Sequence, residues 1–204
     1  MRRVALLAAA CVLALAACSS LGMGSAPPPA AGASRGGVPA LDGVQVMVFP
    51  VQSMTNVRGN ADAELTDALG ARGPEVRWIM PEALRSMVAR SPALDVPIED
   101  LPVGVFLRAE VRRIGDPLFG QIRRLAALAN GRLALIPIEV RHRPDTPEKP
   151  GAVEVVAALI DATNGNVYWF GIVEGVAGSA TDPRALASAA DALARRLLPV
   201  SAGI

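Results

Sequence analysis

Residues 152–176 read AVEVVAALIDATNGNVYWFGIVEGV, and this stretch decides the fold. Two apolar runs, 152–161 and 167–176, flank the dipeptide Asn164-Gly165. Asn-Gly between two such runs is the strongest short signal for a β-hairpin, since both residues tolerate the positive φ angles of a tight turn. The stretch therefore predicts two long antiparallel strands joined by a short turn.

The rest of the chain alternates between strand and helix patterns. Strands are predicted at 44–50, 75–80 and 133–140, and helices at 61–72, 81–90 and 183–198. Asp116-Pro117 predicts the start of a further helix, which ends at Gly131. Pro137 has no N–H to donate, so the strand at 133–140 is expected at a sheet edge or with a bulge. The segment 103–114 fits either a helix or a strand, and we favour a helix.

These elements predict a single α/β domain of the mixed α+β kind. Their order is β-α-β-α-α-α-β-β-β-α, which gives a mixed sheet of about five strands flanked by helices. The last three strands form a C-terminal meander, and a final helix follows them. An Asp191–Arg195 pair is expected on the surface of that helix, because the two side chains lie one turn apart.

Residues 1–17 have the pattern of a bacterial signal peptide for export. Arg2 and Arg3 precede an apolar run of 14 residues from 4 to 17, which is too short to cross a bilayer as a helix. The run ends in Leu15-Ala16-Ala17-Cys18, which resembles the lipobox of bacterial lipoproteins. This resemblance implies cleavage between Ala17 and Cys18 and attachment of diacylglycerol to the Cys18 thiol. Acyl chains, palmitate among them, would then anchor the protein to a membrane.

A flexible tether is expected between this anchor and the domain. Residues 18–43 start at Cys18 and are rich in Pro, Gly, Ala and Ser, which bury too little apolar surface to fold. The residues after Cys18 would have a root-mean-square reach of about 25–30 Å. Ser19 resembles the outer-membrane default of proteobacterial lipoprotein sorting. We therefore expect residues 44–204 to form a periplasmic domain, anchored to the outer membrane of the cell envelope.

The composition excludes several kinds of chemistry. Cleavage removes Cys11 and lipidation occupies Cys18, so the mature chain has no thiol for catalysis, disulfides or metal binding. Without residues 1–17 the chain has 18 basic and 19 acidic side chains, a balance that disfavours nucleic acid as a partner. The only histidine, His142, is expected in a solvated loop without an orienting carboxylate. We expect no catalytic residue, no metal and no cofactor.

Two features are candidates for binding a partner. Arg112, Arg113, Arg123 and Arg124 would form a basic patch if the segments that carry them are neighbours. A solvated helix face is the simpler account of them. Trp169 lies within a predicted strand and faces opposite to its two neighbours. Packing in the core explains this tryptophan, and exposure as a binding aromatic is the alternative.

Three pieces of the chain together resemble a superfamily of bacterial envelope lipoproteins. They are VMVFP at 46–50, the strand at 75–80 with PEAL at 81–84, and LIDATNGNVYW at 159–169 before a strand with Gly171 and Gly175. The superfamily includes the curli-secretion lipoprotein, the amino-terminal domain of the Tol translocation protein, and lipoprotein activators of peptidoglycan synthases. The resemblance implies a nucleotide-free α/β domain that has no catalytic site and acts by binding protein partners.

The expected function is that of a non-enzymatic accessory or assembly factor of the cell envelope. The protein would recognise an envelope protein while anchored to the membrane through Cys18. An auxiliary subunit of an envelope transport or secretion system, which could be oligomeric, is the alternative. A hydrolase of cell-wall or lipid material is a third interpretation, for which the sequence offers no catalytic pattern.

Overall fold

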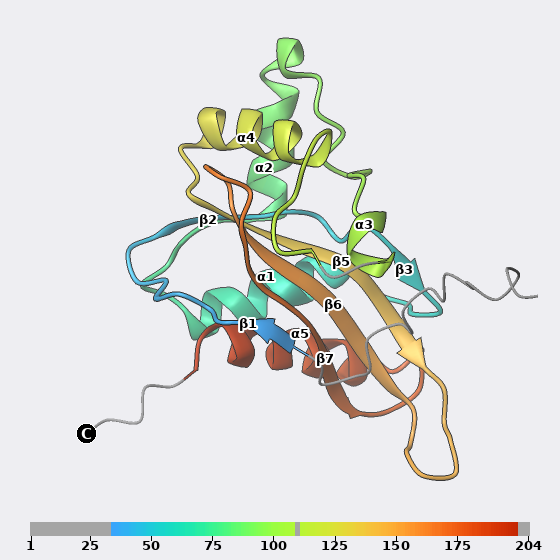
Figure 1. The fold of residues 1–204 in the computed structure, drawn as a ribbon. Helices are drawn as coiled ribbons and strands as arrows, with labels where there is room; N and C mark the ends of the chain where they lie inside the picture. Colours follow the sequence, from blue (N-terminus) through green and yellow to red (C-terminus); the bar gives the residue numbers. More distant parts are fainter. Residues whose placement is uncertain (1–33, 109–110, 200–204) are drawn as a thin grey trace, which may run out of the picture.

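A seven-stranded mixed sheet forms the centre of the fold (Figure 1). The computed structural model describes residues 34–108 and 111–199. The strands are β1 (Ser34–Gly36), β2 (Gln45–Val48), β3 (Met54–Thr55), β4 (Arg77–Ile79), β5 (Leu133–Arg143), β6 (Ala152–Asp161) and β7 (Val167–Ala177). Their order across the sheet is β1-β7-β6-β5-β2-β4, and β3 pairs with the later part of β5. Two short strands, β1 and β3, are the ones that the sequence did not predict.

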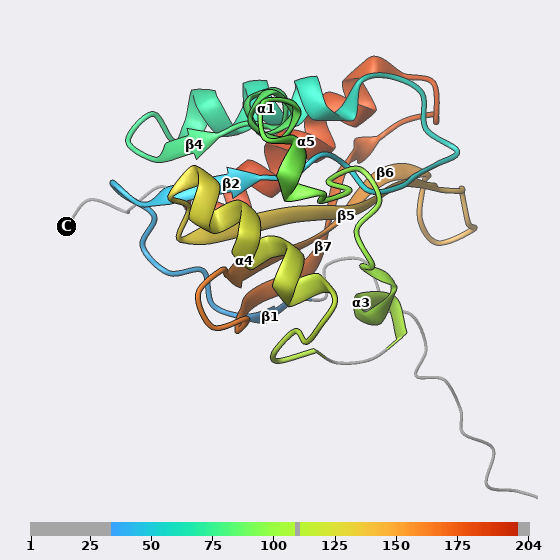
Figure 2. The same ribbon diagram turned by 90° about the horizontal axis from the view of Figure 1, so that it is seen from above.

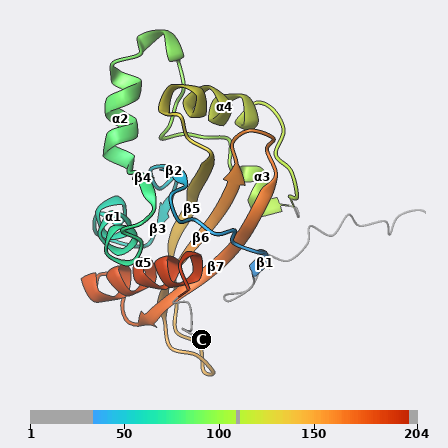
Figure 3. The same ribbon diagram turned by 90° about the vertical axis from the view of Figure 1, so that its left-hand side faces the viewer.

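Helices cover both faces of the sheet, so the domain has three layers (Figures 2 and 3). One face carries α1 (Ala61–Arg72) and α5 (Pro183–Leu197), and the other carries α2 (Pro81–Ala89), α3 (Gly104–Arg108) and α4 (Leu118–Ala129). Each interface contains its own cluster of buried apolar side chains. The strand β6 lies between the two clusters and is buried along its whole length, as expected for a strand with a helical layer on either side. None of the helices in the described part of the chain has the length and apolar character needed to cross a membrane.

The helices α1, α2, α4 and α5 begin at or within one residue of the predicted positions. Asn60 caps α1 by accepting a hydrogen bond from the Ala63 N–H at 3.1 Å, as a side chain at this position commonly does. Asp182 caps α5 in the same way, and the predicted Asp191–Arg195 ion pair forms on that helix. The helix predicted from Asp116-Pro117 is α4, which begins one residue later at Leu118.

The strand that contains Pro137 is central and not at an edge. β5 lies between β2 and β6, and its register shifts between Pro137 and Glu139, which is the predicted bulge. The bulge accommodates a residue without an N–H inside the sheet. The Pro137 carbonyl accepts a hydrogen bond from the Gln52 N–H at 3.0 Å. β5 also continues to Arg143, so His142 lies in a strand and not in the predicted loop.

Only the first part of the ambiguous segment 103–114 is helical. α3 is held by Phe106, whose side chain is buried in the cluster beneath α2 and α4. Further along, the Ile114 N–H donates to the Gly165 carbonyl at 2.9 Å, in the turn of the β6–β7 hairpin. The expected helix does not reach residue 114, because the Ile114 N–H is hydrogen-bonded to the hairpin turn and is not available for a helical hydrogen bond.

Residues 34–43 belong to the folded domain and not to the predicted tether. β1 pairs with β7, and Leu41 is only 3% exposed. Gly36, with a φ of +77°, comes so close to the Tyr168 carbonyl oxygen that a Cβ would lie 2.0 Å from it. Composition could not predict this strand, because its three residues are exposed and its pairing depends on the outer edge of β7.

Candidate functional site

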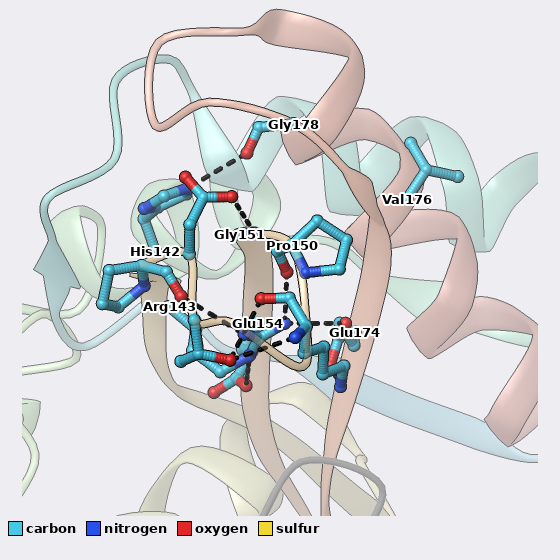
Figure 4. Close-up of polar contacts among 12 residues, drawn as sticks. His142, Arg143, Pro150, Gly151, Glu154, Glu174, Val176 and Gly178 are labelled. Atoms are coloured by element: carbon cyan, nitrogen blue, oxygen red, sulfur yellow. Dashed lines mark hydrogen bonds and ion pairs between the residues drawn. The ribbon is translucent and has the colours of Figure 1, made fainter.

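A cluster of charged side chains lies at one end of the β5–β6–β7 meander (Figure 4). On the strands, these side chains project from the sheet face that α2 and α4 cover further along. We call this group the meander-end cluster, and it consists of Glu139, Arg141, Arg143, Lys149, Glu154 and Glu174. Charge thus replaces the apolar core at this end of the sheet.

Glu154 is the centre of the cluster and is only 2% exposed. Its Oε2 accepts a hydrogen bond from Arg141 Nε at 3.0 Å, and its Oε1 lies 3.3 Å from Arg143 Nε. Arg141 also pairs with Glu139 at 3.3 Å, and Arg143 donates to Glu174 at 3.1 Å. Removing a carboxylate from water costs several kcal/mol unless cations and hydrogen bonds compensate it. The two arginines therefore allow a carboxylate near the start of the buried strand β6.

The ion pairs of the meander-end cluster join its side chains to one another, and none of its carboxylates is free to act as a general base. Its three cations face three carboxylates, and Lys149 completes the set by pairing with Glu174. A general base needs a lone pair that is directed at a substrate, and here every carboxylate is engaged by a cation. The arrangement connects all three strands of the meander and the loop between β5 and β6.

His142 lies beside the cluster, on the other face of β5 (Figure 4). Its Nε2 is 2.9 Å from the Gly178 carbonyl oxygen. A carbonyl oxygen only accepts, so Nε2 carries the proton and donates it to this bond. The bond ties the end of β5 to the turn after β7, which corrects the expectation of a solvated histidine. Across residues 34–108 and 111–199, no three His, Cys, Asp or Glu side chains come together as a metal site.

The meander-end cluster was not predicted from the sequence, although a signal for it exists. Glu154 and Glu174 interrupt two otherwise apolar stretches, and the hairpin register places them opposite each other. Two carboxylates side by side repel one another unless cations lie between them. The Arg141-His142-Arg143 sequence supplies those cations from the neighbouring strand.

The four arginines of the predicted basic patch are exposed but lie on two separate elements. Arg112 and Arg113 lie in the segment beside the β6–β7 turn, where Arg113 Nε donates to the Asn164 carbonyl at 2.9 Å. Arg123 and Arg124 lie on the solvent side of α4. Arg113 thus helps to hold the turn. Partner binding by the four residues stays a prediction.

One carboxylate, Asp161, fixes the β6–β7 turn. Its Oδ1 accepts hydrogen bonds from the N–H groups of Thr163 at 2.7 Å and Asn164 at 3.2 Å, and its Oδ2 accepts one from the Tyr168 hydroxyl at 2.9 Å. Burial alone would raise the pKa of Asp161, but the hydrogen bonds outweigh it and hold that pKa below its ordinary value of 3.8. The bond to Asp161, together with burial, raises the pKa of Tyr168 above 10.0.

Alkaline titration should show this coupling directly, because Tyr168 is the only tyrosine of the chain. Tyrosinate absorbance should report a pKa above 10.0, and Asp161→Asn, which removes the charge but little volume, should bring the pKa of Tyr168 back toward that value. At the acid end, the ionised Asp161 stabilises the fold above pH 3.8, and this contribution is lost as the pH falls through its lower folded-state pKa. An unchanged Tyr168 titration in Asp161→Asn would contradict the coupling.

Trp169 is a core residue, as the favoured interpretation of the sequence predicts, and the alternative of an exposed aromatic that binds a partner is wrong. Its side chain is 0% exposed and packs in the cluster beneath α1 and α5. The indole lies over Gly171, where an added Cβ would be 2.7 Å from its Cζ2. Among the described residues, nothing accepts a hydrogen bond from its Nε1.

An open groove runs along the outer edge of β7 beside α5. β1 pairs only with 169–171 of β7, and no strand within the described ranges pairs with that side of β7 beyond Gly171. The groove has a volume of about 650 Å³.

We call this cavity the β7 edge groove. It is lined by Ser34, Lys149, Trp169, Ile172, Val173, Glu174, Ala192, Arg195 and Arg196. Lys149 and Glu174 also belong to the meander-end cluster, so the cluster forms one end of the groove.

No protein-family model matches the chain, and no curated protein matches its sequence. Among solved structures, the C-terminal domain of LpoB from Salmonella enterica is similar, with a TM-score of 0.46, 15% identity, and coverage of 70% of this chain and 88% of that one. A PelC dodecamer from Paraburkholderia phytofirmans has a TM-score of 0.38, 20% identity, and coverage of 81% and 92%. Lipoprotein GNA1162 from Neisseria meningitidis has a TM-score of 0.38, 14% identity, and coverage of 65% and 81%. These similarities are remote and assign no activity to this chain.

Proposed function

We propose that the protein is a lipid-anchored, non-enzymatic accessory factor of the bacterial cell envelope, which recognises another envelope protein. The observation that carries this proposal is the motif Leu15-Ala16-Ala17-Cys18 at the end of an export signal. Only residues 19–33 separate Cys18 from β1. The lipid would thus hold a folded α/β domain close to a membrane, and Ser19 favours the periplasmic side of the outer membrane.

The geometry of the domain supports recognition as its task. The charges of the meander-end cluster neutralise one another, and His142 is engaged with a backbone carbonyl. The outer edge of β7, in contrast, has no strand partner among the described residues beyond Gly171 and borders a groove. An open sheet edge is a common surface for binding a protein partner.

Cys18→Ser is expected to abolish lipidation, because serine has no thiol to carry the diacylglycerol. Cells fed an alkyne analogue of palmitate should label the parent protein and not this variant. Cys11→Ser is the matched control, since Cys11 leaves with the signal peptide and its loss should not change the labelling. Equal labelling of Cys18→Ser and the parent would contradict the anchor.

Recognition is tested with the same strains. Chemical cross-linking in intact cells should join the lipidated protein to another envelope protein, in the parent and in Cys11→Ser alike. The absence of any cross-linked envelope protein would contradict the proposed function, whatever the labelling shows.

A further inference from the structure

We infer that the β7 edge groove binds an extended, acidic segment of the partner as an additional strand beside β7. This inference rests on the proposed function, because it names the surface through which the partner is recognised. It combines an open strand edge, a groove beside that edge, and an excess of positive charge along the groove.

The open edge is short and well defined. β1 covers β7 only as far as Gly171, and the Val176 N–H is already taken by the Ser188 hydroxyl at 2.9 Å. The outer backbone groups of 172–175 therefore have no strand partner in the described part of the chain. Unpaired N–H and C=O groups at a sheet edge are a template for another strand.

β1 demonstrates that this edge accepts an extended segment. It pairs with β7 in antiparallel register, with Ser34 opposite Gly171 and Gly36 opposite Trp169. All three residues of β1 are exposed, so backbone pairing rather than side-chain burial holds them. A second segment could use the same backbone contacts immediately beyond Gly171.

Charge favours an acidic occupant. The lining contains three cations, Lys149, Arg195 and Arg196, and a single carboxylate, Glu174. Glu174 is engaged by Arg143 and Lys149, and Arg195 pairs with Asp191, so two of the three lining cations already face a carboxylate. Arg196 donates to the Ser34 hydroxyl at 2.9 Å, and no carboxylate among the described residues pairs with it. Carboxylates on an incoming strand would complement this excess.

Two other occupants fit less well. A second copy that paired through its own β7 edge would bring two sets of these cations together, and like charges repel. The chain's own residues 19–33 contain no acidic side chain, and Pro27, Pro28 and Pro29 have no N–H to donate. A partner with an acidic strand would supply backbone groups that pair with the outer edge of β7 and carboxylates that face the cations of the groove.

Fluorescence anisotropy with the full-length lipidated protein in detergent micelles tests the inference. The probe is a fluorescein-labelled nine-residue peptide of alternating valine and glutamate. It should bind saturably, a peptide with lysine in place of glutamate should bind at least about tenfold more weakly, and a peptide methylated at every backbone amide should not bind. Absence of saturable binding, or equal binding of either comparison peptide, would overturn the inference.

Variants locate the site. Arg195→Ala combined with Arg196→Ala should weaken binding of the glutamate peptide about tenfold, as expected for the loss of two charge contacts. Arg184→Ala removes an exposed arginine from the other end of α5 and should leave binding unchanged. Lys149→Ala, which leaves the Arg196–Ser34 bond in place, should also weaken binding. Equal affinities in all variants would overturn the assignment to the groove.

A photo-cross-linking amino acid in cells separates this inference from the proposed function. Placed at Val176, 60% exposed at the end of the edge, it should capture the envelope partner. Leu128, 42% exposed on α4, is the control position on the other helical layer. Capture at Leu128 but not at Val176 would overturn the groove and leave the proposed function standing. Capture at neither position, with no chemical cross-link, would overturn both.

Discussion

Trp169→Ala is expected to lower the free energy of unfolding by about 4 kcal/mol, within the range for truncating a buried tryptophan. The side chain is the largest of the fully buried ones, and it packs between β7 and the helices α1 and α5. Alanine would leave a cavity that rigid strands cannot close. Urea denaturation followed by circular dichroism measures the loss.

Trp78→Ala is the matched control, because the chain has only two tryptophans. Trp78 is half-buried on the edge strand β4, and its Nε1 donates to the Gly73 carbonyl at 2.8 Å. Its loss should cost clearly less than the loss of Trp169. Equal destabilisation by the two substitutions would show that burial does not set the contribution of Trp169.

Glu154→Ala should destabilise the protein by about 3 kcal/mol, the lower end of the range for removing one partner of a buried ion pair. Arg141 and Arg143 would remain beside the emptied position, each with only one carboxylate left in the meander-end cluster. Thermal and urea unfolding at neutral pH measure the effect.

Glu82→Ala provides the comparison, since Glu82 pairs with Arg85 on the surface with 84% of its side chain exposed. Its removal should cost less than about 1 kcal/mol. A double-mutant cycle of Glu154→Ala with Arg141→Ala should give a coupling energy above about 1 kcal/mol. Additive effects in that cycle would contradict a direct Glu154–Arg141 interaction.

Local signals in the sequence predicted the elements that local chemistry determines. The Asn164-Gly165 turn, the apolar stripe of the helix predicted at 61–72 and the Asp182-Pro183 helix start each act within a few residues. The hairpin and the helices α1 and α5 follow from them. The fold class was correct for the same reason, since the alternation of strands and helices survives small errors in boundaries.

Features that depend on distant partners were not predictable in this way. β1 exists because β7 has a free outer edge, and Pro137 is tolerated in a central strand because a bulge interrupts the register beside it. The meander-end cluster needs the register of three strands, which no single segment encodes. Lipidation of Cys18 stays a prediction, because Cys18 lies outside the described residues.

The docking of β1 also sets how the domain would respond to mechanical load. Fully extended, residues 19–33 span at most about 50 Å, and three residue pairs hold β1 to β7. A pull on the lipid anchor would peel β1 away and release the chain as far as the buried Leu41, which raises the maximal span to about 75 Å. If Cys18 carries the proposed lipid, the pairing of β1 with β7 would keep the domain closer to the bilayer, and its release under load would lengthen the connection.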